Sequence, residues 1–173
     1  MTASIRSISF TALLLLGPSA QAAGGDDEPG QGWRPVSGTG VHRFSTALVH
    51  GEPEQTATGF VQRSTEIVEL SGDLVGRVLY HPVSVFDLAA GTLVNSGHQV
   101  FSGTVLGGQP VLMLDDTFRF EVDLDTRATR GEVFLETVLA GDRRTRCELT
   151  ISGNGATDAA GDAVVDYEGR CRV

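Results

Sequence analysis

Four polar residues interrupt the apolar faces of alternating segments, and they are the first candidates for chemistry. Three of them, Glu69, Tyr80 and Tyr167, lie at the same alternate positions of their segments as apolar residues. The fourth, Glu136, lies on a segment with apolar residues on both faces. A carboxylate inside an apolar interior has a raised pKa and can act as a general acid or base, and a tyrosine beside it can guide a proton. The alternative interpretation is structural, with the glutamates on the solvated face and the tyrosines packed in the core. Segment 131–139 carries apolar residues on both parities, so its inward face stays open.

Two arginine-rich stretches, DTRATR and GDRRTR, are candidates for binding an anionic group. They contain Arg127, Arg130, Arg143 and Arg144, which we expect at the ends of the fold. A guanidinium group pairs with a carboxylate through two parallel hydrogen bonds, so these residues would suit a ligand that carries a carboxylate. The alternative is that they only balance nearby acidic residues on the surface.

Metal chemistry has little support in the sequence. The four histidines, His42, His50, His81 and His98, form no HxH or HExxH motif, and there is no CxxC motif. His42 and His50 share a parity, but eight residues of extended strand separate them too far to bind one ion. We therefore expect no metal and interpret the histidines as solvated or rim residues.

Composition excludes several other function classes. There is no GxSxG motif, and all 13 basic residues are arginine, which leaves no lysine for a Schiff base or a P-loop. A formal net charge of −9 disfavours nucleic acid and anionic membranes as partners. We expect no cofactor.

The closing stretch SGNGATDAAGDAVVDYEGRC is predicted to be a hairpin. It lacks the alternating aspartates of a calcium loop, and it does not open a helix that could hold a phosphate. Its glycines suit positive φ angles in a long turn, where Asp158 and Asp162 bond to local backbone.

The two cysteines fix the register of this hairpin. If Cys147 faces Cys171, then Leu149 faces Gly169 and Ile151 faces Tyr167, so the two apolar alternations meet on one face. A disulfide between Cys147 and Cys171 follows, with two buried free thiols as the alternative.

Period-two alternation from Val41 onward predicts the strands that position these residues. In FRFEVDL, for example, apolar and charged residues alternate without a break. Short turns separate the segments, which favours a single antiparallel barrel of about eight strands over a lipocalin-like barrel or a sandwich. The segments are 41–50, 64–70, 74–88, 92–105, 111–114, 118–124, 131–139, 145–152 and 163–173.

The N-terminal segment predicts export. Residues 1–22 have an early arginine, a short apolar core and an Ala-Gln-Ala ending, which is typical of a signal peptide cleaved near Ala22. Residues 23–40 are rich in glycine, proline and acid and are predicted to be a flexible arm. The barrel is then expected over 41–173 in a secreted or periplasmic protein, without a membrane span.

Three motifs of this chain resemble the small bacterial barrels related to allene oxide cyclase, including uncharacterised members. They are SGDLVG (71–76), HQVFSGTVLGGQPVLMLDDTFRF (98–120) and GNGATDAAGDAVVDYEG (153–169), and the resemblance covers 64–173. It implies an eight-stranded barrel with a ligand-sized interior, often an oligomer, whose active members cyclise or isomerise a hydrophobic molecule. Ala159 departs from the leucine usual there, and no motif carries over a catalytic residue.

The predicted function is binding of a small hydrophobic or amphipathic molecule inside the barrel. The alternative is a cofactor-free cyclase or isomerase that acts on such a ligand in the same cavity. A third interpretation is an interaction module whose outer face forms a homo-oligomer.

Overall fold

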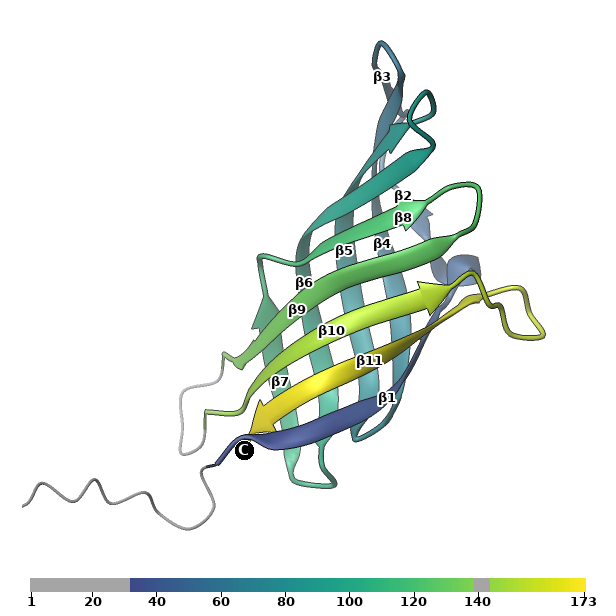
Figure 1. The fold of residues 1–173 in the computed structure, drawn as a ribbon. Coiled ribbons are helices and arrows are strands. Elements are labelled where there is room, and N and C mark those ends of the chain that lie inside the picture. The colour runs from purple at the N-terminus through teal and green to yellow at the C-terminus, as the bar shows by residue number, and fades with distance from the viewer. Residues whose placement is uncertain (1–31, 139–143) are drawn as a thin grey trace, which may run out of the picture.

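Antiparallel strands dominate the part of the chain that the computed structural model describes, residues 32–138 and 144–173 (Figure 1). A 3-10 turn, η1 (Phe44–Thr46), follows the first strand. The strands are β1 (Arg34–His42), β2 (Leu48–Val49), β3 (Glu54–Gln55), β4 (Gly59–Gly72), β5 (Leu74–Asp87), β6 (Thr92–Val105), β7 (Pro110–Asp115), β8 (Arg119–Asp123), β9 (Ala128–Thr137), β10 (Arg146–Asn154) and β11 (Ala163–Arg172).

Eight strand positions close into an antiparallel barrel. Their order is β1-β11-β10-β9-β7-β6-β5-β4, and β8 continues the place of β7 between β6 and β9. The barrel closes where β1 pairs with β4, with Gly38 opposite Gly72 and His42 opposite Val68. Closure pairs both edges of the sheet, which is the physical advantage of this fold over an open sheet. The predicted all-β barrel is confirmed.

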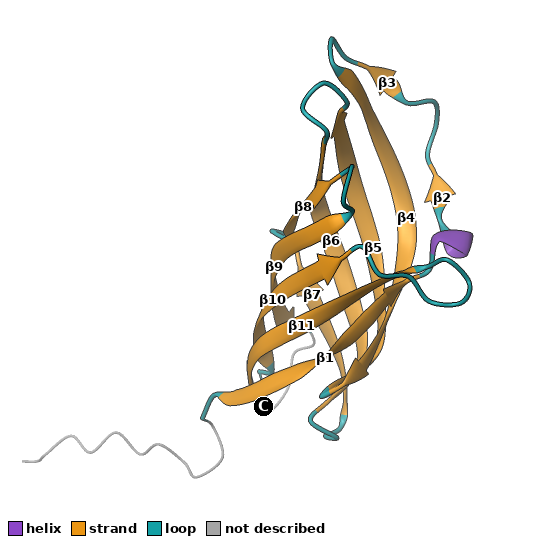
Figure 2. Cartoon of the chain, turned by 45° about the vertical axis from the view of Figure 1, so that its right-hand side comes forward, coloured by secondary structure: helices purple, strands orange, loops and turns teal. Residues whose placement is uncertain are grey.

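Two short strands cover an edge that the barrel itself leaves free. Strand β1 ends opposite Val68, so the first residues of β4 have no partner from β1. Strand β2 pairs with β4 at Ser64 and Thr65, and β3 pairs with it at Phe60 and Val61. Figure 2 shows both strands alongside the part of β4 that rises beyond the barrel.

The predicted arm was too long at its C-terminal end. Strand β1 begins at Arg34, so seven residues assigned to a flexible arm belong to the barrel. Its inward positions are Val36, Gly38 and Gly40, and the two glycines lack the apolar side chains that would have signalled a strand. The predicted strand 41–50 is interrupted after His42 by η1, and of its second half only Leu48–Val49 is a strand, the separate β2. The predicted signal peptide and the rest of the arm, up to residue 31, lie outside the described residues.

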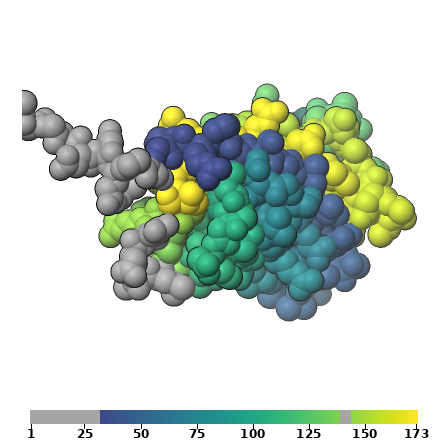
Figure 3. All heavy atoms as spheres, turned by 90° about the horizontal axis from the view of Figure 1, so that it is seen from below, coloured from purple at the N-terminus to yellow at the C-terminus, as the bar shows by residue number. Residues whose placement is uncertain are grey.

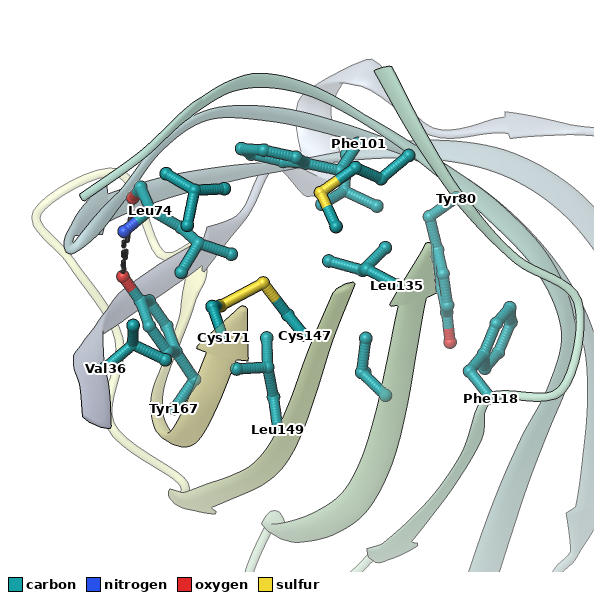
Figure 4. Close-up of a cluster of buried hydrophobic side chains, with 14 residues drawn as sticks. Val36, Leu74, Tyr80, Phe101, Phe118, Leu135, Cys147, Leu149, Tyr167 and Cys171 are labelled. Carbon is teal, nitrogen blue, oxygen red and sulfur yellow. Dashed lines mark hydrogen bonds between the residues drawn. A yellow bond between two sulfur atoms is a disulfide. The ribbon is translucent and has the colours of Figure 1, made fainter. Parts of the chain in front are cut away.

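One end of the barrel is packed solid. Leu74, Phe101, Met113 and Leu135 are almost completely buried there, together with the two cysteines (Figure 4). Figure 3 looks at this end from below and shows a surface filled by neighbouring strands. The barrel is therefore plugged at this end.

Tyr167 of β11 links β11 to the β4–β5 turn at this end. Its hydroxyl oxygen accepts a 2.7 Å hydrogen bond from the backbone N–H of Leu74 and donates one of 3.1 Å to the carbonyl of Ser71 (Figure 4). A side chain at Gly38 would collide with this hydroxyl group, and Gly72 has φ of 105° beside it. Two glycines of the β1–β4 seam thus make room for the tyrosine of β11.

The disulfide predicted from the register is present. Cys147 of β10 and Cys171 of β11 are bonded, with Cα atoms 4.1 Å apart, and both are fully buried. The predicted partners are also confirmed, with Leu149 opposite Gly169 and Ile151 opposite Tyr167. The bond crosses the hairpin at the plugged end, so it fixes the last two strands beside the core.

Candidate functional site

The other half of the barrel interior is hollow. A cavity of about 500 Å³ lies between the strands, within the range of small-molecule sites. Its wall is mostly apolar and includes Val68, Val78, Val133, Leu149 and Val165. The β8–β9 turn and the β10–β11 loop border it at the end opposite the plug.

An apolar strip continues from this cavity along the sheet that rises beyond the barrel. Phe60, Phe86, Leu93 and Val122 stand opposite one another on four neighbouring strands. The rings of Phe60 and Phe86 stack at 4.3 Å, and Leu93 and Val122 line the cavity itself. An apolar molecule approaching the barrel would meet a continuous surface that leads inward.

A histidine and a glutamate form a polar corner in this wall. His42, at the end of β1, lines the cavity, and its Nε2 atom is hydrogen-bonded to a carboxylate oxygen of Glu66 on β4. The Ser64 hydroxyl group donates to the other oxygen of Glu66, whose side chain is 12% exposed. Burial alone would raise the pKa of Glu66, but the hydrogen bonds from His42 and Ser64 outweigh it and hold that pKa below its usual value.

Tyr80 stands next to this corner, as predicted for a cavity tyrosine. Its ring meets that of His42 edge-on at 5.8 Å and packs against Phe118 and Phe120. Burial strongly raises its pKa, and the charge of Glu66 raises it further, so the hydroxyl group keeps its proton. The side chain of Asn95 opposes this shift of the Tyr80 pKa without cancelling it.

Tyr167 also lines the cavity, but its hydroxyl group is used by the fold. The bonds to Leu74 and Ser71 occupy both its oxygen and its proton. Its pKa is raised mainly by burial. The structure therefore supports the structural interpretation of Tyr167.

Glu69 and Glu136 point outward, which agrees with the structural alternative for these two candidates and not with a cavity role. On β4 the inward residues are Val68 and Leu70, so Glu69 points outward with Ile67. On β9 the inward residues are Val133 and Leu135, which settles the parity left open for this segment and leaves Glu136 exposed. Both segments have apolar residues on both faces, so alternation alone could not choose between them.

Glu69 instead belongs to a network of charges that anchors the closing loop. Arg43 donates to Glu69 at 2.8 and 2.9 Å, to Asp158 at 2.8 Å and to Asp162 at 3.1 Å. Asp158 also accepts from the backbone N–H of Ala160 and Asp162, as predicted for a turn aspartate. The loop thus lies against the end of β1 beside the cavity.

This network predicts a loss of stability in acid. Hydrogen bonds from Arg43 hold the pKa of Glu69 below its ordinary value of 4.5. Burial alone would raise the pKa of Asp158, but hydrogen bonds from the backbone N–H groups of Asp162 and Ala160 and from the Arg43 side chain outweigh it and lower that pKa from 3.8. Lowered pKa values contribute stability that is complete above pH 4.5 and is lost as pH falls through the folded-state values. The unfolding midpoint in urea should therefore drop below pH 4.5. The drop should be smaller in Arg43→Gln and unchanged in Arg63→Gln, and an equal drop in both variants would contradict the assignment.

The four arginine candidates do not form one site. Arg127, in the β8–β9 turn with φ of 60°, borders the cavity. Arg130 points outward from β9 and pairs with Glu121 at 3.0 Å. Arg144 is exposed at the opposite end of the barrel, and Arg143 lies outside the described residues.

The remaining histidines lie on the outer surface. The rings of His81 and His98 stack at 4.7 Å across β5 and β6, and Thr65 links His81 with His50. Within residues 32–138 and 144–173, no group of three or more histidine, cysteine, aspartate or glutamate side chains could hold a metal ion.

The sequence analysis missed the chemical role of His42 and Glu66. Glu66 lies at the same alternate positions of β4 as Val68 and Leu70, and this pattern could have predicted that it faces the interior. His42 was considered only as a metal ligand, because nothing local pairs it with a residue 24 positions away. Their contact exists only because β1 closes the barrel against β4.

No family model, no curated protein and no solved structure matches the chain. The resemblance to allene oxide cyclase-like barrels therefore stays a prediction that rests on the three motifs. In the described part of the chain, no helix has the length and apolar character to cross a membrane.

Proposed function

We propose that the protein binds a small, mainly apolar molecule inside its barrel. The cavity of about 500 Å³, with its apolar wall, carries this proposal. Such a wall favours an apolar ligand because binding removes apolar surface from water on both sides. The plug keeps the space from collapsing, since the disulfide and Tyr167 hold the strands around it.

We also propose that the protein works outside the cytoplasm. The segment 1–22 resembles a signal peptide, and a disulfide persists in an oxidising compartment. The intact mass of the protein recovered from the periplasm or medium tests this, since it should lack the first 22 residues. Assembly into a homo-oligomer stays a prediction of the resemblance.

Nile red, an uncharged dye that fluoresces in apolar surroundings, tests the binding function. We expect saturable binding of one dye per chain. A control with excess decanol should displace the dye, because both compete for one cavity. Fluorescence that rises without saturation would mean that the dye only adsorbs to the surface.

Arg127 is expected to select ligands with an anionic head. Its position beside the cavity would let it pair with a carboxylate while the ligand's tail lies inside. Arg127→Met should weaken binding of the fluorescent fatty acid parinaric acid about fivefold, which is the roughly 1 kcal/mol of an exposed ion pair. Arg130→Met is the matched control on the outer face of β9. Equal effects of both variants, or a similar loss of Nile red binding, would contradict this role.

The second candidate function is a cofactor-free cyclase or isomerase. The resemblance suggests it, and the polar corner of His42, Glu66 and Tyr80 in an apolar wall favours it. Of the four residues predicted as catalytic candidates, Tyr80 alone keeps a role here, since Tyr167 is used by the fold and the two glutamates face outward.

A further inference from the structure

Few polar side chains of the cavity wall are free to act on a ligand. Gln99 donates to the buried carboxylate of Asp115 at 3.1 Å, and Tyr167 is held by backbone groups. Arg127 borders the outer end of the cavity. The rings of His42 and Tyr80 are neighbours in the wall, and Asn95 in the same wall has a buried Oδ1 atom without a hydrogen-bond partner.

The contact with Glu66 determines which ring nitrogen of His42 can act on a ligand. A carboxylate is only an acceptor when ionised, and Glu66 already accepts from the Ser64 hydroxyl group. The contact with His42 therefore places the ring proton on Nε2. Within the described residues no group hydrogen-bonds to Nδ1, so in the neutral ring that atom carries a free lone pair.

Tyr80 complements this base with a donor. Tyr80 lines the cavity, and burial keeps its hydroxyl group protonated, so that group can donate to a ligand. Phe118 and Phe120 surround the ring and exclude water from it. A base and a neutral hydrogen-bond donor in one apolar cavity are the groups needed to form and stabilise an enolate.

We propose that His42 is a general base, that Glu66 is its positioning residue, and that the substrates are small apolar ketones with a double bond one carbon removed from conjugation. This inference rests on the proposed ligand-binding function. Among the described residues, no serine or cysteine lines the wall, and the base and donor of His42 and Tyr80 suit the transfer of a proton within one molecule.

The reaction conserves all atoms and electrons. His42 Nδ1 removes a proton from the carbon between the carbonyl group and the double bond. The released electron pair delocalises into a dienolate, whose oxygen accepts a hydrogen bond from Tyr80. Protonated His42 then returns the proton to the far carbon of the double bond, and the carbonyl reforms in conjugation with the moved double bond.

Isopulegone is a suitable probe, because its conversion to pulegone follows this scheme and creates a conjugated ketone that absorbs in the ultraviolet. The full exported chain should accelerate this conversion over buffer. His42→Gln should lower kcat about 100-fold, as is usual for loss of a general base. The matched control His98→Gln changes an exposed histidine on the outer face and should leave the rate unchanged.

Two further variants separate chemistry from structure. Glu66→Gln should lower kcat about tenfold with KM unchanged, because the ligand still fits while the ring loses its orientation. Tyr80→Phe keeps the packing and removes only the hydroxyl group, and it should also lower kcat about tenfold. A merely structural role of either residue would change Nile red binding together with the rate.

The outcomes distinguish this inference from the function on which it rests. Nile red binding without acceleration of isopulegone conversion would overturn the inference and leave the binding function intact. A His42→Gln variant that binds the dye and isomerises at the original rate would overturn it as well. Absence of dye binding to the unsubstituted chain would overturn the binding function itself.

Discussion

Val165→Trp should weaken Nile red binding at least about thirtyfold, equivalent to about 2 kcal/mol, because the indole ring occupies the cavity. Val165 lines the cavity from β11, and its neighbours across the strands are Gly40 of β1 and Gly153 of β10. Since neither glycine has a side chain, a larger residue at 165 has room beside it without forcing the strands apart. The barrel should therefore stay folded.

Leu79→Trp is the matched control for this substitution. Leu79 lies on the outward parity of β5 and is 43% exposed, so its replacement adds the same ring outside the barrel. Dye titrations and urea unfolding of both variants are the required measurements. Equal dye affinity in Val165→Trp and the unsubstituted protein would mean that the ligand does not enter this cavity.

The double variant Cys147→Ala/Cys171→Ala should lower the free energy of unfolding by about 3 kcal/mol. The disulfide spans a sequence separation of 24, and closing a loop of this length restricts the unfolded chain by about that amount. Urea unfolding of the oxidised protein, the reduced protein and the double variant gives the comparison.

The reduced protein is the internal control for this result. It should resemble the double variant, because both have lost the same constraint on the unfolded chain. A double variant within about 0.5 kcal/mol of the oxidised protein would contradict the assignment of this stability to the bond. Ligand affinity measured well below the unfolding midpoint should change little, since the bond lies in the plug rather than in the cavity wall.

Much of the barrel could be predicted because period-two alternation determines both strands and register. Shifting a strand by one residue would turn its buried side chains to solvent, so the pairing of Leu149 with Gly169 followed from two alternating patterns. The same logic gave the disulfide. The turn at the closing loop followed from its glycines, since Gly155 and Gly161 do have positive φ angles.

The sequence predicted the face of Glu69 and the start of β1 poorly, because the alternation of apolar residues is ambiguous at the first and absent at the second. Both faces of β4 carry apolar residues, so alternation could not decide whether Glu69 or Val68 faces the interior, and the structure shows that Val68 does. The start of β1 was missed because Gly38 and Gly40 give no apolar signal. These glycines are required by close packing against Tyr167 and Val165, which only the closed barrel reveals.

The candidate site was predicted only in part. Tyr80 and the presence of an interior cavity followed from the sequence, but the pairing of His42 with Glu66 depends on how β1 closes against β4. A contact between strands that are not joined by a hairpin has no local signature. The chemistry of the cavity therefore emerged from the fold.

The most direct test of ligand binding inside the barrel is to locate a bound ligand by NMR. Intermolecular contacts between Nile red and methyl-labelled protein should appear at Val133, Leu149 and Val165, which line the cavity. Contacts instead at Val75, Leu79 and Val85, the exposed apolar residues on the outer face of β5, would contradict the account.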